Sequence, residues 1–174
     1  MAVHATDPTA PLGQHFGPPP FRFAPSGGVT VEGPAFSTAF RALATLIVGG
    51  CAAWVVRLWL RGDLVAGSGL VWVAAGLVLM GWTWWCVMTS RTRLGADGLH
   101  QRWIWDKQMP LRELAYCKLI RVRGLEWLIA PRLYARTLTG KFAVFYGASP
   151  ALIAEFERLR DELSAFRRSG GGLS

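Results

Sequence analysis

Charged side chains are scarce in this sequence. Only 17% of its 174 residues are Asp, Glu, Lys or Arg, whereas soluble domains average about a quarter. Acidic residues are the scarcer sign, because 11 Asp and Glu stand against 19 Lys and Arg and give a formal net charge of +8. The low charge argues against an ordinary soluble domain, and the excess of basic residues points to an anionic partner.

Cysteine and histidine are equally sparse, with three of each, and they form no redox or metal-binding pattern. Cys51 and Cys86 fall in apolar runs, Cys117 falls in a mixed segment, and no CxxC spacing occurs. Such cysteines are typical of small buried hydrophobic residues. His4 and His15 have no companions at metal-ligand spacing. We therefore expect neither a metal nor another cofactor.

The motifs of the common enzyme classes are missing as well. There is no glycine-rich phosphate loop and no nucleophile elbow. His100 lies between Asp97 and Asp106, but no Ser or Cys nucleophile accompanies these residues in a triad context. Glu157 and Asp161 share one face of a predicted helix, where arginines flank them and solvent surrounds them. The sequence predicts a protein that is not an enzyme.

Residues 1–35 lack any sustained apolar period. They contain seven of the ten prolines, including Pro18, Pro19 and Pro20 in a row, and several glycines. This composition predicts a disordered N-terminal tail. The segment also lacks the basic start and apolar run of a secretory signal peptide, so we expect no cleavage.

Two long apolar runs dominate residues 36–90. The polar break Arg61-Gly62-Asp63 separates them, and they predict helices over 37–60 and 64–89. A helix of about 25 residues spans roughly 37 Å, which exceeds a bilayer core of about 30 Å. Arg57 lies close enough to the break for its stem to reach the interface. The sequence predicts an antiparallel transmembrane helical hairpin.

Small residues recur along both predicted helices at the spacing of one helix face. They are Gly49 and Ala53 on the first helix and Gly67, Ala74 and Gly81 on the second. Small side chains let helix backbones approach closely in lipid. We expect these residues to pack the two helices together, and the alternative is that they form a dimer interface.

Basic residues are more frequent beside the outer ends of the hairpin than at its turn. Arg57 and Arg61 lie near the turn, while the outer ends are accompanied by Arg41, Arg91, Arg93, Arg102 and Lys107. By the positive-inside rule, this distribution predicts that both termini lie in the cytoplasm and the turn lies outside.

Residues 91–168 change to short segments with alternating polarity. They carry most of the positive charge, because residues 91–174 contain fifteen Lys and Arg against eight Asp and Glu. Turn signals at Asp97-Gly98 and Thr139-Gly140 predict two β-hairpins.

A helix is predicted over 150–168, with Ser149 as N-cap and one apolar stripe formed by Leu152, Phe156, Leu159, Leu163 and Phe166. Residues 169–174 are predicted to be a flexible tail. The fold class is therefore an α+β membrane protein.

The order of these segments resembles that of membrane-anchored bacterial pleckstrin-homology-like domains. The resemblance is carried by the two transmembrane helices and the segments LGADGL, MPLREL, KLIRVR, LYARTLTGKFAVFYG and SPALIAEF. It implies a strongly bent antiparallel sheet or partial barrel that the C-terminal helix closes at one end. It also implies a location in the bacterial inner membrane and supplies no catalytic motif.

Basic residues surround one apolar triplet of the predicted β domain. Arg121, Arg123, Arg132 and Arg136 flank Trp127-Leu128-Ile129. If the triplet is an exposed loop tip, it inserts among lipid head groups while the arginines contact phosphates, each contributing on the order of 1 kcal/mol. The alternative is a buried strand beside a solvated basic face, which is favoured because apolar triplets usually belong to a core.

Two functions remain open at this point. The first is an interaction module at the cytoplasmic membrane surface that binds anionic lipid or a protein, or forms a homo-oligomer. The second is an accessory subunit of a transport or envelope-stress complex, which contacts other membrane helices through its hairpin. Nucleic acid is not expected, because a basic domain tethered to a membrane faces anionic head groups more readily.

Overall fold

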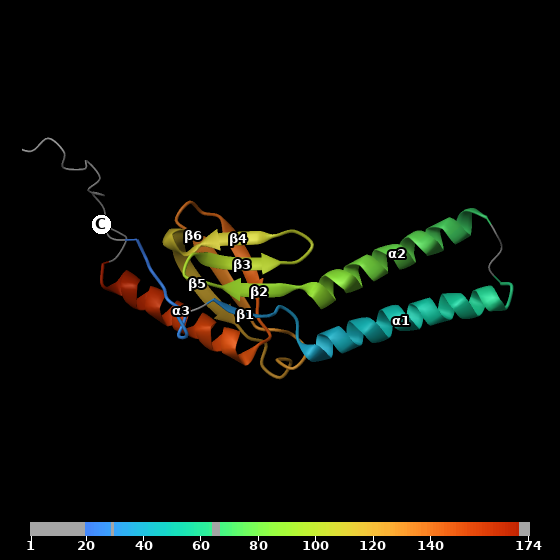
Figure 1. The fold of residues 1–174 in the computed structure, drawn as a ribbon, viewed down its shortest axis with the longest axis horizontal. Coiled ribbons are helices and arrows are strands. Elements are labelled where there is room, and N and C mark those ends of the chain that lie inside the picture. The colour runs from blue at the N-terminus through green and yellow to red at the C-terminus, as the bar shows by residue number, and fades with distance from the viewer. Residues whose placement is uncertain (1–19, 29, 64–66, 171–174) are drawn as a thin grey trace, which may run out of the picture.

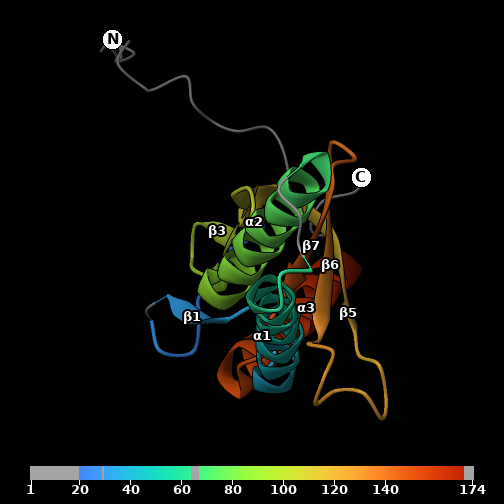
Figure 2. The same cartoon turned by 90° about the vertical axis from the view of Figure 1, so that its right-hand side faces the viewer.

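The structure, a computed structural model, describes residues 20–28, 30–63 and 67–170. Helices α1 (Thr38–Leu60) and α2 (Ser68–Thr89) lie side by side and project from one end of a β domain, which also carries helix α3 (Pro150–Arg168). The view along the hairpin shows the same arrangement (Figure 2). The predicted combination of two apolar helices, antiparallel sheets and a C-terminal helix is confirmed.

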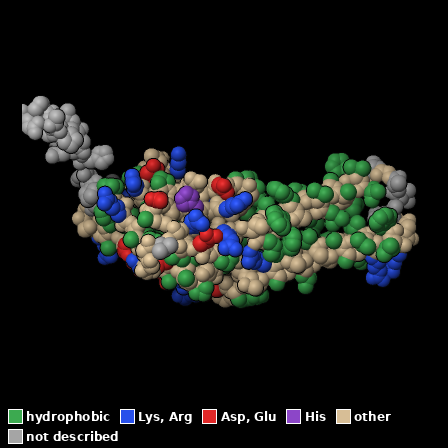
Figure 3. Space-filling view, in the orientation of Figure 1, with side chains coloured by type: hydrophobic (Ala, Val, Ile, Leu, Met, Phe, Trp, Pro, Cys, Tyr) green, Lys and Arg blue, Asp and Glu red, His purple; other side chains and the backbone are tan. Residues whose placement is uncertain are grey.

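Helices α1 and α2 are long and apolar enough to cross a membrane. The 23 residues of α1 span roughly 34 Å at the rise of an α-helix. None of them is buried within the described structure. Apolar side chains cover both helices, whereas charged side chains gather over the β domain and at the tip of the hairpin (Figure 3). A core helix of a soluble protein would bury one apolar face, and α1 buries none.

The contact between α1 and α2 runs through large side chains. The Trp84 ring nitrogen donates a hydrogen bond of 2.9 Å to the Thr45 hydroxyl, and the Arg41 guanidinium donates to the Met88 carbonyl. Half-buried positions recur every three or four residues along both helices, including Ala44, Val48, Val55, Val73, Leu77 and Met80. This spacing is that of a helix pair whose side chains interdigitate.

Of the predicted packing residues Gly49, Ala53, Gly67, Ala74 and Gly81, Gly81 alone is half-buried. All but Gly81 are exposed, and a Cβ atom at any of the three glycines would meet no atom within 4 Å. The structure therefore differs from the prediction that these residues pack α1 against α2. Next to the sheet end of the hairpin, an apolar hollow of about 370 Å³ lies between the helices and is lined by Leu, Ile, Val, Met and Trp side chains. Dimerisation through the small residues stays a prediction.

The β domain consists of two antiparallel sheets. One sheet has the order β1-β2-β3-β4 and the other has the order β5-β6-β7, with the short helix η1 (Leu111–Glu113) between them. The sheets do not close into a barrel. The strands are β1 (Val31–Pro34), β2 (Arg91–Leu94), β3 (Gly98–Arg102), β4 (Lys107–Pro110), β5 (Leu114–Ile120), β6 (Arg132–Thr137) and β7 (Phe142–Tyr146).

Strand β1 precedes the hairpin in the chain, yet it pairs with β2, which follows the hairpin. The register runs from Val31 opposite Leu94 to Pro34 opposite Arg91. The two apolar helices are thus an insertion between neighbouring strands of one sheet. The predicted disordered tail over 1–35 is wrong for residues 31–34, because a partner about sixty residues away stabilises a segment that has little strand propensity of its own.

Residues 20–28 also belong to the folded domain. Phe21 and Phe23 are buried in the core. The Ser26 hydroxyl and backbone N–H donate to the buried Glu155 carboxylate, which also accepts from Arg158 at 3.1 Å. These contacts fasten the segment to α3. Residues 1–19 of the predicted tail lie outside the described residues, as do 171–174 of the predicted C-terminal tail.

Helix α3 covers the core of the β domain with the predicted apolar stripe. Leu152, Phe156, Leu159 and Leu163 are buried, and Phe166 packs against them. They meet side chains from both sheets and the N-terminal segment, including Phe21, Leu94, Leu99, Leu133 and Phe145. The predicted bounds of this helix, 150–168, are confirmed.

Candidate functional site

The helices leave the β domain directly from its paired strands. Three residues link β1 to α1, and Ser90 alone links α2 to β2. The Ala35 backbone N–H donates to the Ser90 carbonyl at 3.3 Å, so the pairing of β1 and β2 continues to the start of the hairpin. We call this end of the domain, from which α1 and α2 emerge, the helix-proximal end.

Two loops lie at the helix-proximal end. The loop of residues 121–131 joins β5 to β6, and its Leu128 carbonyl accepts a 2.7 Å hydrogen bond from the hydroxyl of Ser37, the N-cap of α1. The turn of residues 103–106 joins β3 to β4 and follows Arg102, which pairs with Arg91 at the start of β2. Both connections lie beside the emerging helices (Figure 1).

The loop of residues 121–131 contains the apolar triplet, and it is not a buried strand. Trp127 is 65% exposed and Leu125 is also exposed. Backbone hydrogen bonds from Leu128 and Ile129 to the Leu125 carbonyl fold the loop on itself, and Gly124 adopts a φ of +84° that favours glycine. The favoured buried-strand interpretation is therefore wrong, because the triplet lies in a folded loop in which Trp127 is exposed and Leu128 and Ile129 are half-buried.

The turn of residues 103–106 presents a second apolar surface. Trp105 is 64% exposed and Ile104 is exposed beside it. Trp103 anchors the turn, with its ring 5.9 Å from that of Phe36 and 6.5 Å from that of Tyr146. The sequence interpretation missed this surface, although apolar residues immediately before the polar Asp106-Lys107-Gln108 turn are an available signal.

The structure gathers only part of the predicted arginine set. Arg123 and Trp127 share the loop of residues 121–131, and Arg132, at the helix-proximal start of β6, lies 5.5 Å from the Tyr146 ring. Arg121 is close by but is paired with Glu157 at 2.5 Å. Arg136 is four residues further along β6, roughly 13 Å from the helix-proximal end. The site therefore includes Arg123, Trp127 and Arg132 and excludes Arg136.

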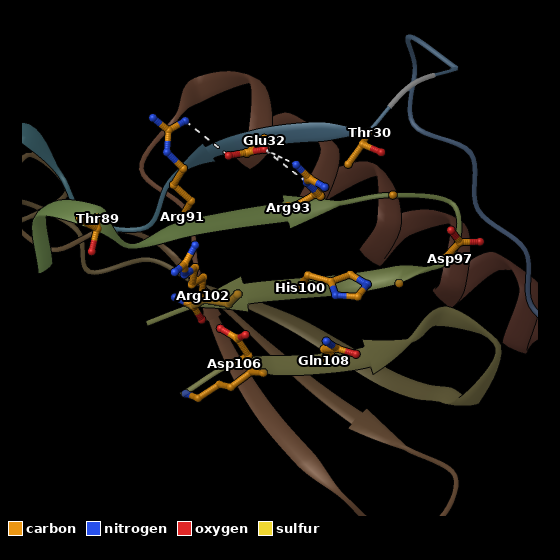
Figure 4. A pocket seen from close by; sticks show the side chains of 14 residues that line it. Thr30, Glu32, Thr89, Arg91, Arg93, Asp97, His100, Arg102, Asp106 and Gln108 are labelled. Carbon is orange, nitrogen blue, oxygen red and sulfur yellow. Dashed lines mark hydrogen bonds and ion pairs between the residues drawn. The ribbon is translucent and has the colours of Figure 1, made fainter. Parts of the chain in front are cut away.

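A polar groove of about 480 Å³ crosses the outer face of the four-stranded sheet (Figure 4). Its basic lining residues are Arg91, Arg93, Arg102 and Lys107, and its acidic ones are Glu32, Asp97 and Asp106. The sequence interpretation counted the basic residues only as charges near a helix end. Alternation along β2 and β3 was the available signal, because residues two apart on a strand share one face.

Glu32 is the centre of the ion pairs in this groove. Its carboxylate accepts from Arg93 at 2.8 and 3.2 Å and from Arg91 at 3.4 Å. The hydrogen bonds from Arg93, followed by those from Arg91, hold the pKa of Glu32 below its ordinary value. At neutral pH this carboxylate is ionised, and its ion pairs with Arg91 and Arg93 link β1 to β2.

Three residues that the sequence analysis considered as catalytic candidates lie together in the structure. Asp97, His100 and Asp106 line the same groove, but its lining includes no Ser or Cys. The described residues contain no group of three or more His, Cys, Asp or Glu side chains that could hold a metal ion. Burial raises the pKa of the Cys117 thiol to about 12, so this thiol is a poor nucleophile at neutral pH.

No family model matches the chain, and neither the curated proteins nor the solved structures include a significantly similar protein. The comparisons therefore support no assignment to the membrane-anchored bacterial pleckstrin-homology-like family.

Proposed function

We propose that this protein is a non-catalytic membrane-surface module. In this proposal α1 and α2 span a bilayer, and the helix-proximal end of the β domain binds anionic lipid head groups. The observation that carries the proposal is the pair of exposed tryptophans, Trp105 and Trp127, on two separate loops beside the emerging helices. Tryptophan is enriched where a bilayer meets water, because its ring is apolar and its N–H is polar.

The unburied apolar surface of the hairpin supports the spanning arrangement. Leu46, Trp54 and Val78 are among the many large apolar side chains that α1 and α2 leave exposed. Water would disfavour this surface, whereas lipid solvates it, and an α-helix satisfies its own backbone hydrogen bonds there. Membrane attachment then places both tryptophan loops at the depth of the head groups.

Basic residues at the same end supply the electrostatic part of the proposal. Arg123 and Arg132 accompany Trp127, and Lys107 follows Trp105 closely. Each such residue near an anionic surface contributes on the order of 1 kcal/mol. We place the domain on the cytoplasmic face of a bacterial inner membrane, on the basis of the excess of basic residues at this end. The two antiparallel sheets and C-terminal helix fit the pleckstrin-homology-like resemblance.

A fluorescence experiment on the full chain tests the proposal. Cys51, Cys86 and Cys117 are replaced by Ala, and an environment-sensitive NBD label is attached to Trp127→Cys or Trp105→Cys in phosphatidylglycerol-containing nanodiscs. We expect blue-shifted emission and quenching by spin-labelled lipid at both positions. Phe142→Cys is the matched control, because Phe142 is as exposed as Trp127, at 66% against 65%, but lies at the opposite end of the domain. Emission at 105 and 127 that equals the emission at 142 would overturn the proposal.

No observation specifically favours an accessory subunit that acts through its hairpin. Arg57 would have to meet a partner helix in that case. It instead lines a small hollow with Trp54, Leu58 and Arg61 at the tip of the hairpin. A guanidinium at that position reaches the water interface without a protein partner.

A further inference from the structure

We propose that the polar groove on the outer face of the four-stranded sheet is a phosphate-binding site. In this proposal it takes the phosphate of an anionic lipid head group from the adjoining leaflet. The lipid source rests on the proposed membrane attachment, whereas the phosphate chemistry rests on the groove itself.

Like charges face one another across two strands of this groove. The antiparallel register places Arg91 opposite Arg102. Directly opposed residues have Cβ atoms about 5 Å apart, and like charges in such pairs destabilise a sheet. The alternation of the strands points both arginine side chains to the exposed face. An anion bound between the two guanidinium groups would attract both of them and so offset their mutual repulsion.

The resident carboxylates compensate only part of that charge. Glu32 is held chiefly by Arg93, and its contact with Arg91 is the longest of the three at 3.4 Å. Within the part of the chain that the structure describes, Arg102 forms no ion pair. Arg91 can therefore turn toward a ligand while Glu32 keeps Arg93, and Arg102 is already available.

The two opposed arginines of the groove, Arg91 and Arg102, lie at its helix-proximal end. Asp97 lies in the β2–β3 turn, at the end of the sheet away from the helices. Asp106 lies beside Arg102 (Figure 4). Of the carboxylates that line the groove, Glu32 and Asp106 are therefore the two near the Arg91–Arg102 pair. Lys107 also lines the groove, with its ammonium 5.7 Å from the centroid of the Trp103 ring. Guanidinium groups bind phosphate oxygens in a bidentate manner.

The groove begins at the end of α2, where the proposed membrane attachment would bring lipid phosphates close to it. Thr89, the last residue of α2, belongs to its lining, and a single residue separates Thr89 from Arg91. Its volume of about 480 Å³ exceeds the space that a phosphodiester head group requires, and its lining contains no large apolar side chain. The groove therefore suits the polar head group, while the acyl chains of the same lipid remain in the bilayer.

The site is tested with the full chain in zwitterionic detergent micelles. Thermal unfolding is followed during titration with short-chain phosphatidylglycerol, short-chain phosphatidylcholine or inorganic phosphate. We expect phosphatidylglycerol to raise the unfolding temperature saturably, phosphatidylcholine to have no effect, and Arg102→Gln to weaken the apparent affinity at least tenfold. Arg136→Gln is the matched control, because Arg136 is also an exposed strand arginine.

A second measurement separates binding from a structural role of Arg102. Without ligand, Arg102→Gln should unfold at the same or a higher temperature than the wild type, because it removes a like-charge pair. Equal responses of the wild type and Arg102→Gln to phosphatidylglycerol, or no response of either, would overturn the site. Saturation by inorganic phosphate at equal affinity would overturn the lipid source alone. The NBD signal at position 127 should be unchanged in Arg102→Gln, so this proposal and the proposed function fail separately.

Discussion

At the scale of single residues, the chemistry of this protein depends on how charges are neutralised. The groove holds four basic side chains, and the structure pairs two of them with one carboxylate, Glu32. Arg121, which the sequence analysis assigned to a lipid-contacting set, is instead paired with Glu157 of α3. Residue identity alone does not distinguish an arginine that stabilises the fold from one that is free to bind a ligand.

Glu32 makes the stability of the domain sensitive to acid. Its folded pKa is lowered, so its contribution is fully present above the unfolded pKa and is lost as pH falls through the folded pKa. We expect Glu32→Gln to reduce stability at pH 7 by no more than about 1 kcal/mol, because the pair is partly solvated. Denaturant unfolding between pH 7 and pH 3 should show a smaller loss for Glu32→Gln than for the wild type. An equal loss in both proteins would contradict the role of this carboxylate.

At the scale of elements, strand β1 and the segment before it complete the domain. They lie before the hairpin in the chain, but they contribute one edge of a sheet and two core aromatic residues. A fragment of residues 91–174 would therefore lack part of its own fold. Helix α3 depends on the same segment, because Glu155 accepts hydrogen bonds from Ser26 and the Phe21 ring lies 5.5 Å from the Phe166 ring.

Removing one of these aromatic rings should destabilise the domain strongly. Phe23 is 3% exposed, so we expect Phe23→Ala to cost roughly 3–5 kcal/mol by leaving a cavity. Phe142→Ala removes the same ring from an exposed position and should cost far less. Denaturant unfolding of the full chain in micelles measures both. Similar small losses for the two variants would show that the N-terminal segment does not belong to the core.

At the scale of the whole molecule, the pairing of β1 with β2 constrains the topology. The two strands flank the hairpin and hydrogen-bond to each other, so both outer ends of the hairpin lie on one side of any membrane that it crosses. The short connections to α1 and α2 also fix the orientation of the sheet relative to the hairpin. Movement of the two helices against each other would therefore act directly on the β1–β2 pairing.

Cysteine labelling in bacterial spheroplasts tests this topology. Single cysteines are introduced by Gly27→Cys, Asp63→Cys or Ser169→Cys in a chain without its native cysteines. We expect an impermeant maleimide to label position 63 in intact spheroplasts and positions 27 and 169 only after lysis. Labelling of 27 and 169 on opposite sides would contradict a membrane-crossing hairpin. Labelling of both from outside, with 63 protected, would contradict only the orientation.

The helices were predictable because their signals are local. The apolar runs, the polar break at 61–63, the N-cap Ser149 and the stripe from Leu152 to Phe166 each lie within contiguous residues, so α1, α2 and α3 could be placed to within a few residues. The hairpins β2–β3 and β6–β7 have turn residues between adjacent strands. Pairings of this kind require no information from distant parts of the chain.

The sequence by itself thus determined the apolar hairpin, the basic β-rich segment and the C-terminal amphipathic helix. Only the tertiary structure decided that Val31 pairs with Leu94, that Trp105 and Trp127 lie at the same end of the domain, and that Arg91 faces Arg102. The physical reason is that helix formation and tight turns depend on neighbours in the chain. Strand partners and loop positions depend on which distant surfaces bury each other, and no local pattern encodes that choice.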